Sequence, residues 1–227
     1  MAFPGDPEAT GRPVVNVVGD LVALGPHRRD LLPTYQRWIN DFEVLRALGL
    51  PPPGPTTMEQ EAAWYEAQPA DAARFTIYEE TTWHPLGTTV LHGIDHRNGM
   101  ATFGILIGDA NARGKGYGTE ATQLMLDFAF TALGLHSVML TVSEFNLAGR
   151  RAYEKAGFKE FGRRRQCAGW AAGSGTTSTW TASLPSSPAL CWQACSPRTT
   201  RGTNPSYSSV DVDSPASCRS QGCAEER

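Results

Sequence analysis

The fold is decided by the stretch Arg113-Gly114-Lys115-Gly116-Tyr117-Gly118, which lies between a predicted strand at residues 100–107 and a predicted helix at residues 117–133. Closely spaced glycines permit positive φ angles and let the backbone come close to a ligand. The helix that follows offers unpaired N–H groups and the positive end of its dipole. Together with the charges of Arg113 and Lys115, this predicts an anion site suited to a diphosphate. The alternative is an ordinary glycine-rich turn with two solvated bases.

Two common phosphate-binding motifs do not fit this stretch. The dinucleotide fingerprint needs a third glycine at another spacing and a parallel βαβ unit, whereas the strand before Arg113 belongs to a predicted antiparallel meander. The P-loop needs Gly-Lys followed by Ser or Thr, and Lys115 is followed by Gly116. The stretch is therefore a different kind of anion-binding turn.

The elements around the stretch predict a mixed α/β fold. Period-2 patterns predict strands, and period-3.6 patterns and caps predict helices. The strands are expected at residues 14–24, 74–80, 86–94, 100–107, 137–142 and 158–164. The helices are expected within 26–48, from the Thr57–Gln60 capping box through 64, at 117–133, and from an Asn146 cap to 156. The order β-α-α-β-β-β-α-β-α-β predicts a mixed, mostly antiparallel sheet flanked by helices.

Charge and composition exclude several classes of partner. A net charge of −3 and a pI near 6.0 give no basic field for nucleic acid or a membrane surface. No apolar run reaches the roughly 20 residues of a bilayer span, and the first residues do not resemble a signal peptide. We therefore expect a soluble, cytoplasmic protein. All five cysteines lie after residue 166, where no histidine accompanies them, so we expect no metal site.

The chain changes character after residue 167. Residues 1–13 are predicted to be a flexible N-terminus and residues 14–167 to form the folded domain. In residues 168–227, Ser, Thr, Gly and Pro make up about half of the positions, which leaves little apolar surface to offset chain entropy. This low-complexity tail is predicted to be a disordered extension or the product of a reading-frame change near Cys167. If the shifted tail is real protein, we expect the closing strand to be missing and a sheet edge to be exposed.

Two motifs carry a family resemblance. The first is Arg113-x-x-Gly116-x-Gly118 after the strand that contains residues 103–107, and the second is Asn146 with Arg151-Ala152-Tyr153-Glu154-Lys155-Ala156-Gly157-Phe158. Their order and separation resemble those of the GNAT N-acetyltransferases. The resemblance covers about residues 14–165 and is closest to the branch that acetylates ribosomal-protein N-termini, spermidine or antibiotics.

The resemblance implies acetyl-CoA as the acyl donor and a role for each motif. It implies that the strand ending at Ile107 splays from its neighbour. The residues implied in coenzyme binding are Leu106, Ile107 and Gly108 for the pantetheine arm, Arg113, Gly114, Lys115, Gly116, Tyr117 and Gly118 for the pyrophosphate, and Asn146 near the thioester. Tyr153 is implied as the catalytic acid that protonates the departing thiolate. The alternatives are that Tyr153 packs beside Phe158 and that Asn146 is a plain helix cap.

The base and the acceptor are less specified. Relatives often carry a glutamate near the position of Thr102, which cannot act as a base; Glu144, Glu79 and Glu80 are substitutes, and so is a water chain. The acceptor site is expected among Trp38, Asp41, Glu43, Trp64 and Tyr65, unless these are core and surface residues.

The predicted function is acetyl transfer to a primary amine of a small molecule such as an antibiotic or polyamine. The alternatives are acetylation of a protein N-terminus and a non-catalytic acyl-CoA-binding module, with a homodimer as an option.

Overall fold

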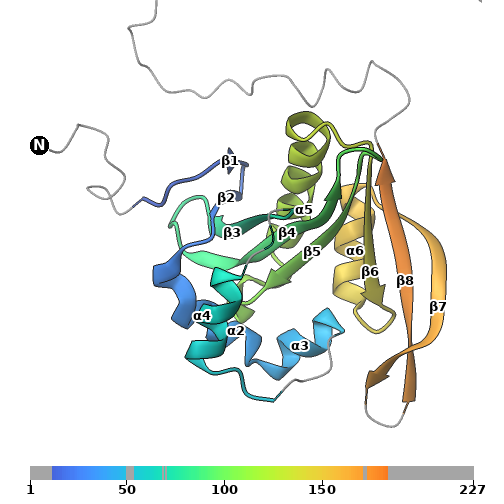
Figure 1. The fold of residues 1–227 in the computed structure, drawn as a ribbon, viewed down its shortest axis with the longest axis horizontal. Helices are drawn as coiled ribbons and strands as arrows, with labels where there is room; N and C mark the ends of the chain where they lie inside the picture. The colour runs from blue at the N-terminus through green and yellow to red at the C-terminus, as the bar shows by residue number, and fades with distance from the viewer. Residues whose placement is uncertain (1–11, 50–53, 68, 70, 171–172, 184–227) are drawn as a thin grey trace, which may run out of the picture.

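The computed structural model describes residues 12–49, 54–67, 69, 71–170 and 173–183 of the 227-residue chain. These residues form an eight-stranded sheet in the order β1-β2-β3-β4-β5-β6-β8-β7 (Figure 1). All neighbouring strands are antiparallel except β5 and β6. The strands are β1 (Val17–Val18), β2 (Val22–Pro26), β3 (Ala73–Glu79), β4 (Pro85–Asp95), β5 (Met100–Ile107), β6 (Ser137–Ser143), β7 (Lys159–Trp170) and β8 (Gly173–Ser183). The predicted mixed, mostly antiparallel α/β fold is confirmed.

The helices lie in two groups. Two of them, α5 (Tyr117–Asp127) and α6 (Leu147–Ala156), lie side by side on one face of the sheet (Figure 1). Their apolar faces cover a core that includes Ile77, Leu91, Met125 and Val138, each fully buried. The other group is η1 (Arg29–Leu31), α2 (Leu32–Ile39), α3 (Phe42–Leu48) and α4 (Met58–Glu66), and it gathers where β5 and β6 end. Among the described residues, no helix is long and apolar enough to cross a membrane.

The strands β5 and β6 separate after a short parallel contact. They pair only where residues 100–102 face residues 137–139. Beyond that point β5 stays paired with β4 to Ile107, and β6 stays paired with β8 to Ser143. A gap therefore opens between residues 103–107 and 140–143, and on its β5 side half of the backbone N–H and C=O groups have no neighbouring strand. The splay that the family resemblance implies is present.

The predicted strand at residues 14–24 is wrong in one respect: a tight turn divides it into β1 and β2. The carboxylate of Glu120, in the first turn of α5, accepts hydrogen bonds from the N–H groups of Asp20, Leu21 and Val22 at 2.7–2.9 Å. The N–H of Gly19 donates to the carbonyl of Val22 at 2.8 Å. Because these bonds hold the turn, the hairpin tip lies beside the start of α5.

The predicted helix within residues 26–48 is also divided. Asp41 leaves the helical conformation and caps α3, and Gly49 ends α3 with a φ of +70°. The predicted capping box at Thr57 is confirmed by both of its hydrogen bonds, of 2.9 and 3.3 Å with Gln60. The predicted helix at residues 117–133 ends as a wide π turn, η3 (Phe128–Ala132).

The expectation that no closing strand follows residue 167 is wrong. Strand β8 inserts between β6 and β7 and pairs with both. On β8 the alternate side chains of Ser178, Trp180 and Ala182 are buried, as period 2 requires for a half-covered strand. Residues 1–11 of the predicted flexible N-terminus (1–13) and residues 184–227 of the predicted tail (168–227) lie outside the described residues, and the reading-frame hypothesis stays a prediction.

Candidate active site

The glycine-rich loop before α5 has the conformation that an anion site needs. Gly114 and Gly116 have φ angles of +78° and +93°, in the left-handed region that favours glycine. Gly116 is the N-cap of α5 and has no side chain with which to bond the helix's first N–H groups. Among the described residues, no backbone or side-chain acceptor binds the N–H groups of Gly114, Lys115 or Gly116. These N–H groups are therefore available to an anionic ligand.

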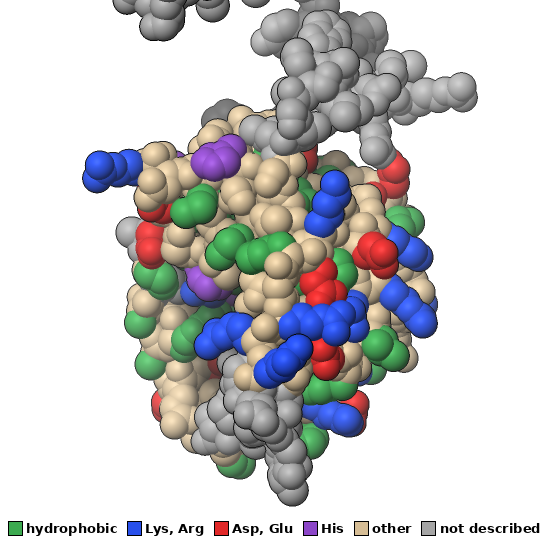
Figure 2. Space-filling model, turned by 90° about the vertical axis from the view of Figure 1, so that its right-hand side faces the viewer, with side chains coloured by type: hydrophobic (Ala, Val, Ile, Leu, Met, Phe, Trp, Pro, Cys, Tyr) green, Lys and Arg blue, Asp and Glu red, His purple; other side chains and the backbone are tan. Residues whose placement is uncertain are grey.

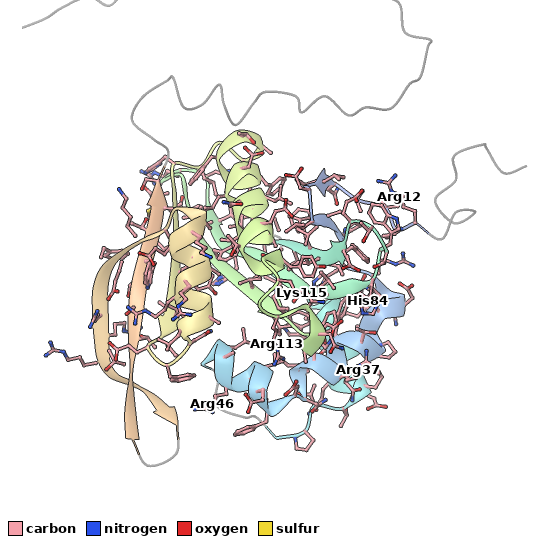
Figure 3. All side chains as sticks on the ribbon, turned by 180° about the vertical axis from the view of Figure 1, so that it is seen from behind. Arg12, Arg37, Arg46, His84, Arg113 and Lys115 are labelled. Carbon is pink, nitrogen blue, oxygen red and sulfur yellow. The ribbon has the colours of Figure 1, made fainter. Side chains whose placement is uncertain are left out.

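Basic side chains surround this loop. Figure 3 shows Arg37, His84, Arg113 and Lys115 on the same side of the molecule. Arg113 Nη2 lies 3.6 Å from Asp41 Oδ2, and His84 Nε2 lies 3.2 Å from Asp109 Oδ2. Cationic side chains therefore lie around the loop together with carboxylates, of which Asp41 and Asp109 are two.

A cavity adjoins the loop and the end of β5. It has a volume of about 340 Å³ and is lined by Arg37, Trp38, Asp41, His84 and residues 108–111. Trp38 is only 5% exposed and lies against the backbone of Gly108, where an added Cβ would be 2.1 Å from the indole ring. Of the proposed acceptor residues, Trp38 thus packs in the core, and Asp41 lies on the loop side of the gap.

The end of β5 and the loop are in contact, so the two halves of the predicted coenzyme site adjoin. A Cβ added to Gly118 would lie 3.6 Å from Cγ1 of Ile107. Leu106 packs against the small cluster of Leu32, Tyr35 and Trp38. The hydroxyl of Tyr117 donates to Glu79, and hydrogen bonds from Thr82 and Tyr117 lower the pKa of Glu79. This places Glu79, one of the proposed bases, beside the loop.

Tyr153, on α6, packs against the part of β5 that borders the gap. Its ring lies edge-on to Phe103 of β5 at 6.2 Å and to Phe158 at 6.0 Å, and the residue is 9% exposed. Burial raises the pKa of Tyr153 to about 12. The phenol is therefore protonated across the neutral range and can act as a hydrogen-bond or proton donor, but not as a base.

Asn146 caps α6 and also contacts α3. Its Oδ1 accepts a hydrogen bond from the N–H of Gly149 at 2.8 Å, as a helix cap should. Its Nδ2 donates to the carbonyl oxygen of Ala47 at 3.1 Å. The cap interpretation is confirmed, and the contact with α3 is one that sequence reasoning missed.

Thr102, which cannot act as a base, is paired between His92 and Met139 within the sheet. Of the proposed bases, Glu144 lies in a setting that does not favour proton abstraction. Glu144 lies 3.6 Å from Arg163, on a flank where cationic and anionic side chains alternate (Figure 2). A larger cavity of about 630 Å³ lies on this flank, between α6 and β7, and none of the predicted site residues lines it. In the described part of the chain, no cluster of His, Cys, Asp and Glu could hold a metal ion.

Comparison with known proteins connects this geometry to N-acetyltransferases. The alpha/beta-tubulin-N-acetyltransferase 9 of Homo sapiens is 28% identical over 160 residues, which cover 63% of this chain and 75% of the relative. The spermidine N(1)-acetyltransferase of Vibrio cholerae is 32% identical over 92 residues, which cover 40% and 53%. The crystal structure of a Vibrio cholerae spermidine N-acetyltransferase in complex with CoA and spermine shares the fold, with a TM-score of 0.67 at 20% identity over 73% of this chain and 96% of that chain.

The family itself follows from a match over more than half of the chain. A model of the acetyltransferase (GNAT) domain family matches residues 22–159, which include the glycine-rich loop, the gap and all of α6. The chain therefore belongs to the GNAT family and is an acyltransferase.

Proposed function

We propose that the chain transfers an acetyl group from acetyl-CoA to a primary amine of a small molecule. The observation that carries this proposal is the uncapped start of α5 directly beside the β5–β6 gap. The gap offers backbone groups of β5 to an extended arm, and the loop offers N–H groups and cations to a diphosphate. Acetyl-CoA has these two parts in this order, and it would supply an activated thioester.

The roles of the coenzyme-binding residues follow from this fit. Leu106, Ile107 and Gly108 would bind the pantetheine arm through their backbone groups. The N–H groups of residues 114–118 would bind the diphosphate, and Arg113, whose own N–H already donates to Ala110, would add charge together with Lys115. Asn146 would act near the thioester by holding the start of α6, because both ends of its amide already bond protein groups.

Tyr153 is the proposed proton donor. The reaction needs a neutral amine and a proton for the thiolate that leaves. A phenol whose pKa is raised to about 12 by burial keeps its proton at neutral pH, so it can hydrogen-bond to the developing thiolate. We leave the base unassigned and propose that water conducts the amine's proton to solvent.

A protein amine is a second candidate acceptor. It is favoured by the similarity to a protein named as a tubulin acetyltransferase, which extends over 160 residues. A small-molecule amine is favoured by the spermidine acetyltransferase relatives. The proposed donor site would serve either acceptor.

The test is acetyl-CoA turnover with detection of the free thiol, using the full chain and a panel of polyamines, aminoglycosides and peptides with free N-termini. We expect one class to accelerate thiol release well above the rate without acceptor. Binding of CoA without turnover on any amine would favour the non-catalytic module. Absence of CoA uptake would refute the proposal.

A further inference from the structure

The short helix α3 crosses the open end of the β5–β6 gap. It contacts both β5 and β6, and no other helix of the α2–α4 group contacts β6 to the same extent among the described residues. Its C-terminal end passes close to β6, because a Cβ added at Gly49 would lie 2.8 Å from Oγ of Ser143. Because α3 contacts both strands, a shift of α3 would affect β5 on one side of the gap and β6 on the other.

The N-terminal end of α3 is tied to the glycine-rich loop by Asp41. One carboxylate oxygen, Oδ1, accepts the N–H of Glu43 at 2.9 Å and caps the helix. The other, Oδ2, lies 3.6 Å from Nη2 of Arg113. The same side chain thus starts α3 and pairs with a cation of the proposed diphosphate site.

The C-terminal end of α3 is tied to the start of α6. The carbonyl oxygen of Ala47 accepts the hydrogen bond from Asn146, and the guanidinium of Arg46 lies 5.3 Å from the ring centroid of Phe145. Because Asn146 caps the helix that carries Tyr153, α3 connects the loop to the helix proposed to hold the proton donor.

We propose that Asp41 is a positioning residue that competes with the coenzyme's diphosphate for Arg113 and so sets donor affinity. The inference rests on the proposed function, which supplies the diphosphate. Asp41 and Arg113 are each about 40% exposed, so their ion pair is weak and a diphosphate can displace it. When Arg113 turns to the diphosphate, α3 loses the ion pair at its first turn. The hydrogen bond from Asn146 at the C-terminal end of α3 remains.

The variant Asp41→Asn separates the charge from the cap. Asparagine caps a helix about as well as aspartate, so α3 keeps its start while the loop loses a negative charge. A unit charge about 4 Å from Arg113 in a solvated setting changes an equilibrium by roughly five-fold. By isothermal titration with CoA at low ionic strength, we expect Asp41→Asn to bind about five-fold more tightly than the wild-type chain. We expect this gain to shrink in 0.5 M salt.

Two controls decide between this role and a merely structural one. Asp41→Glu keeps the negative charge that Asp41→Asn removes, so its affinity for CoA should be closer to that of the wild type. Hydrogen exchange should show faster exchange of the α3 amides when CoA binds the wild type, and no such change in Asp41→Asn, whose tie to Arg113 is already absent.

Each outcome has one meaning. Equal or weaker CoA binding by Asp41→Asn, in a chain whose wild type binds CoA, would overturn the role of Asp41 and leave the proposed function intact. Exchange of the α3 amides that is unchanged or slowed by CoA in the wild type would overturn the link through α3. A wild-type chain that takes up no CoA would instead refute the proposed function.

Discussion

The two helices that flank the β5–β6 gap begin in opposite ways. The first, α5, begins at Gly116, which has a left-handed backbone and no side chain to bond the helix's free N–H groups. The second, α6, begins at Asn146, whose side chain bonds the N–H of Gly149 and also the carbonyl of Ala47. One helix start is open to a ligand and the other is closed by the protein itself.

This difference separates binding from chemistry. An uncapped helix start attracts an anion because its N–H groups and its dipole have no other partner. A capped start is rigid, and it can hold a buried side chain at a constant position. The uncapped N-terminal end of α5 is therefore suited to binding the donor. The capped N-terminal end of α6 is suited to positioning Tyr153. The predictions below test this division, beginning with the largest effect.

Tyr153→Phe should lower the turnover rate without weakening the binding of CoA. The ring and its contacts with Phe103 and Phe158 remain, while the proton donor is lost. We expect kcat to fall about 100-fold, the usual scale for removal of a general acid. The CoA dissociation constant should change by less than about two-fold.

The pH dependence of kcat gives a second reading of the same residue. The pKa of Tyr153 is raised to about 12, so the protonated form persists as pH rises and is lost only above that value. We therefore expect no fall in kcat from ionisation of Tyr153 between pH 7 and about pH 10. An unchanged kcat in Tyr153→Phe would remove Tyr153 from the mechanism.

Gly116→Val should weaken the binding of CoA. A β-branched residue at a φ of +93° is strained, and its side chain would stand where the ligand's phosphates approach. We expect CoA affinity to fall on the order of 30-fold, measured by titration calorimetry. Gly157→Val is the matched control, because it places the same β-branched side chain at a φ of +102° at the C-terminal end of α6, where an added Cβ meets nothing within 4 Å. If the control weakens CoA binding equally, general loss of stability explains the effect.

Much of this contrast could be predicted from sequence, because a helix start is a local feature. The glycine spacing at Gly114 and Gly116 predicts left-handed turns, and an asparagine three residues before Gly149 predicts a cap. Strand β8 was missed because composition averaged over the whole tail conceals a short stretch of period 2, in which Trp180 and Ala182 point inward.

What could not be predicted depends on residues far apart in the chain. The break between β1 and β2 depends on Glu120, about a hundred residues away. The pairing of Asp41 with Arg113 joins a helix cap to the loop, and each residue has an ordinary local explanation. Only the tertiary fold shows that the cap of α3 contacts the candidate diphosphate site.

Asn146→Ala should show whether the closed start of α6 is required. The change removes the cap and the bond to Ala47, and we expect unfolding to become easier by about 1 kcal/mol. Asn146→Asp keeps the cap oxygen and replaces the donor to Ala47 with a carboxylate oxygen, which cannot make that bond. Thermal unfolding should therefore rank the wild type first, Asn146→Asp second and Asn146→Ala last. Equal loss in both variants would mean that the bond to α3 carries the stability and that the cap adds nothing.

Lys115→Met should give the smallest effect and the clearest sign of charge. Lys115 is exposed, so its attraction for a diphosphate is screened by water and by salt. We expect CoA affinity to fall about three-fold at low ionic strength and the difference to vanish near 0.5 M salt. Arg97→Met removes an equally exposed cation from the β4–β5 turn, at the other end of β5, and should change nothing. A loss that persists in high salt would mean that Lys115 shapes the loop through its stem. In that case the uncapped N-terminal end of α5 would bind the donor through backbone N–H groups alone.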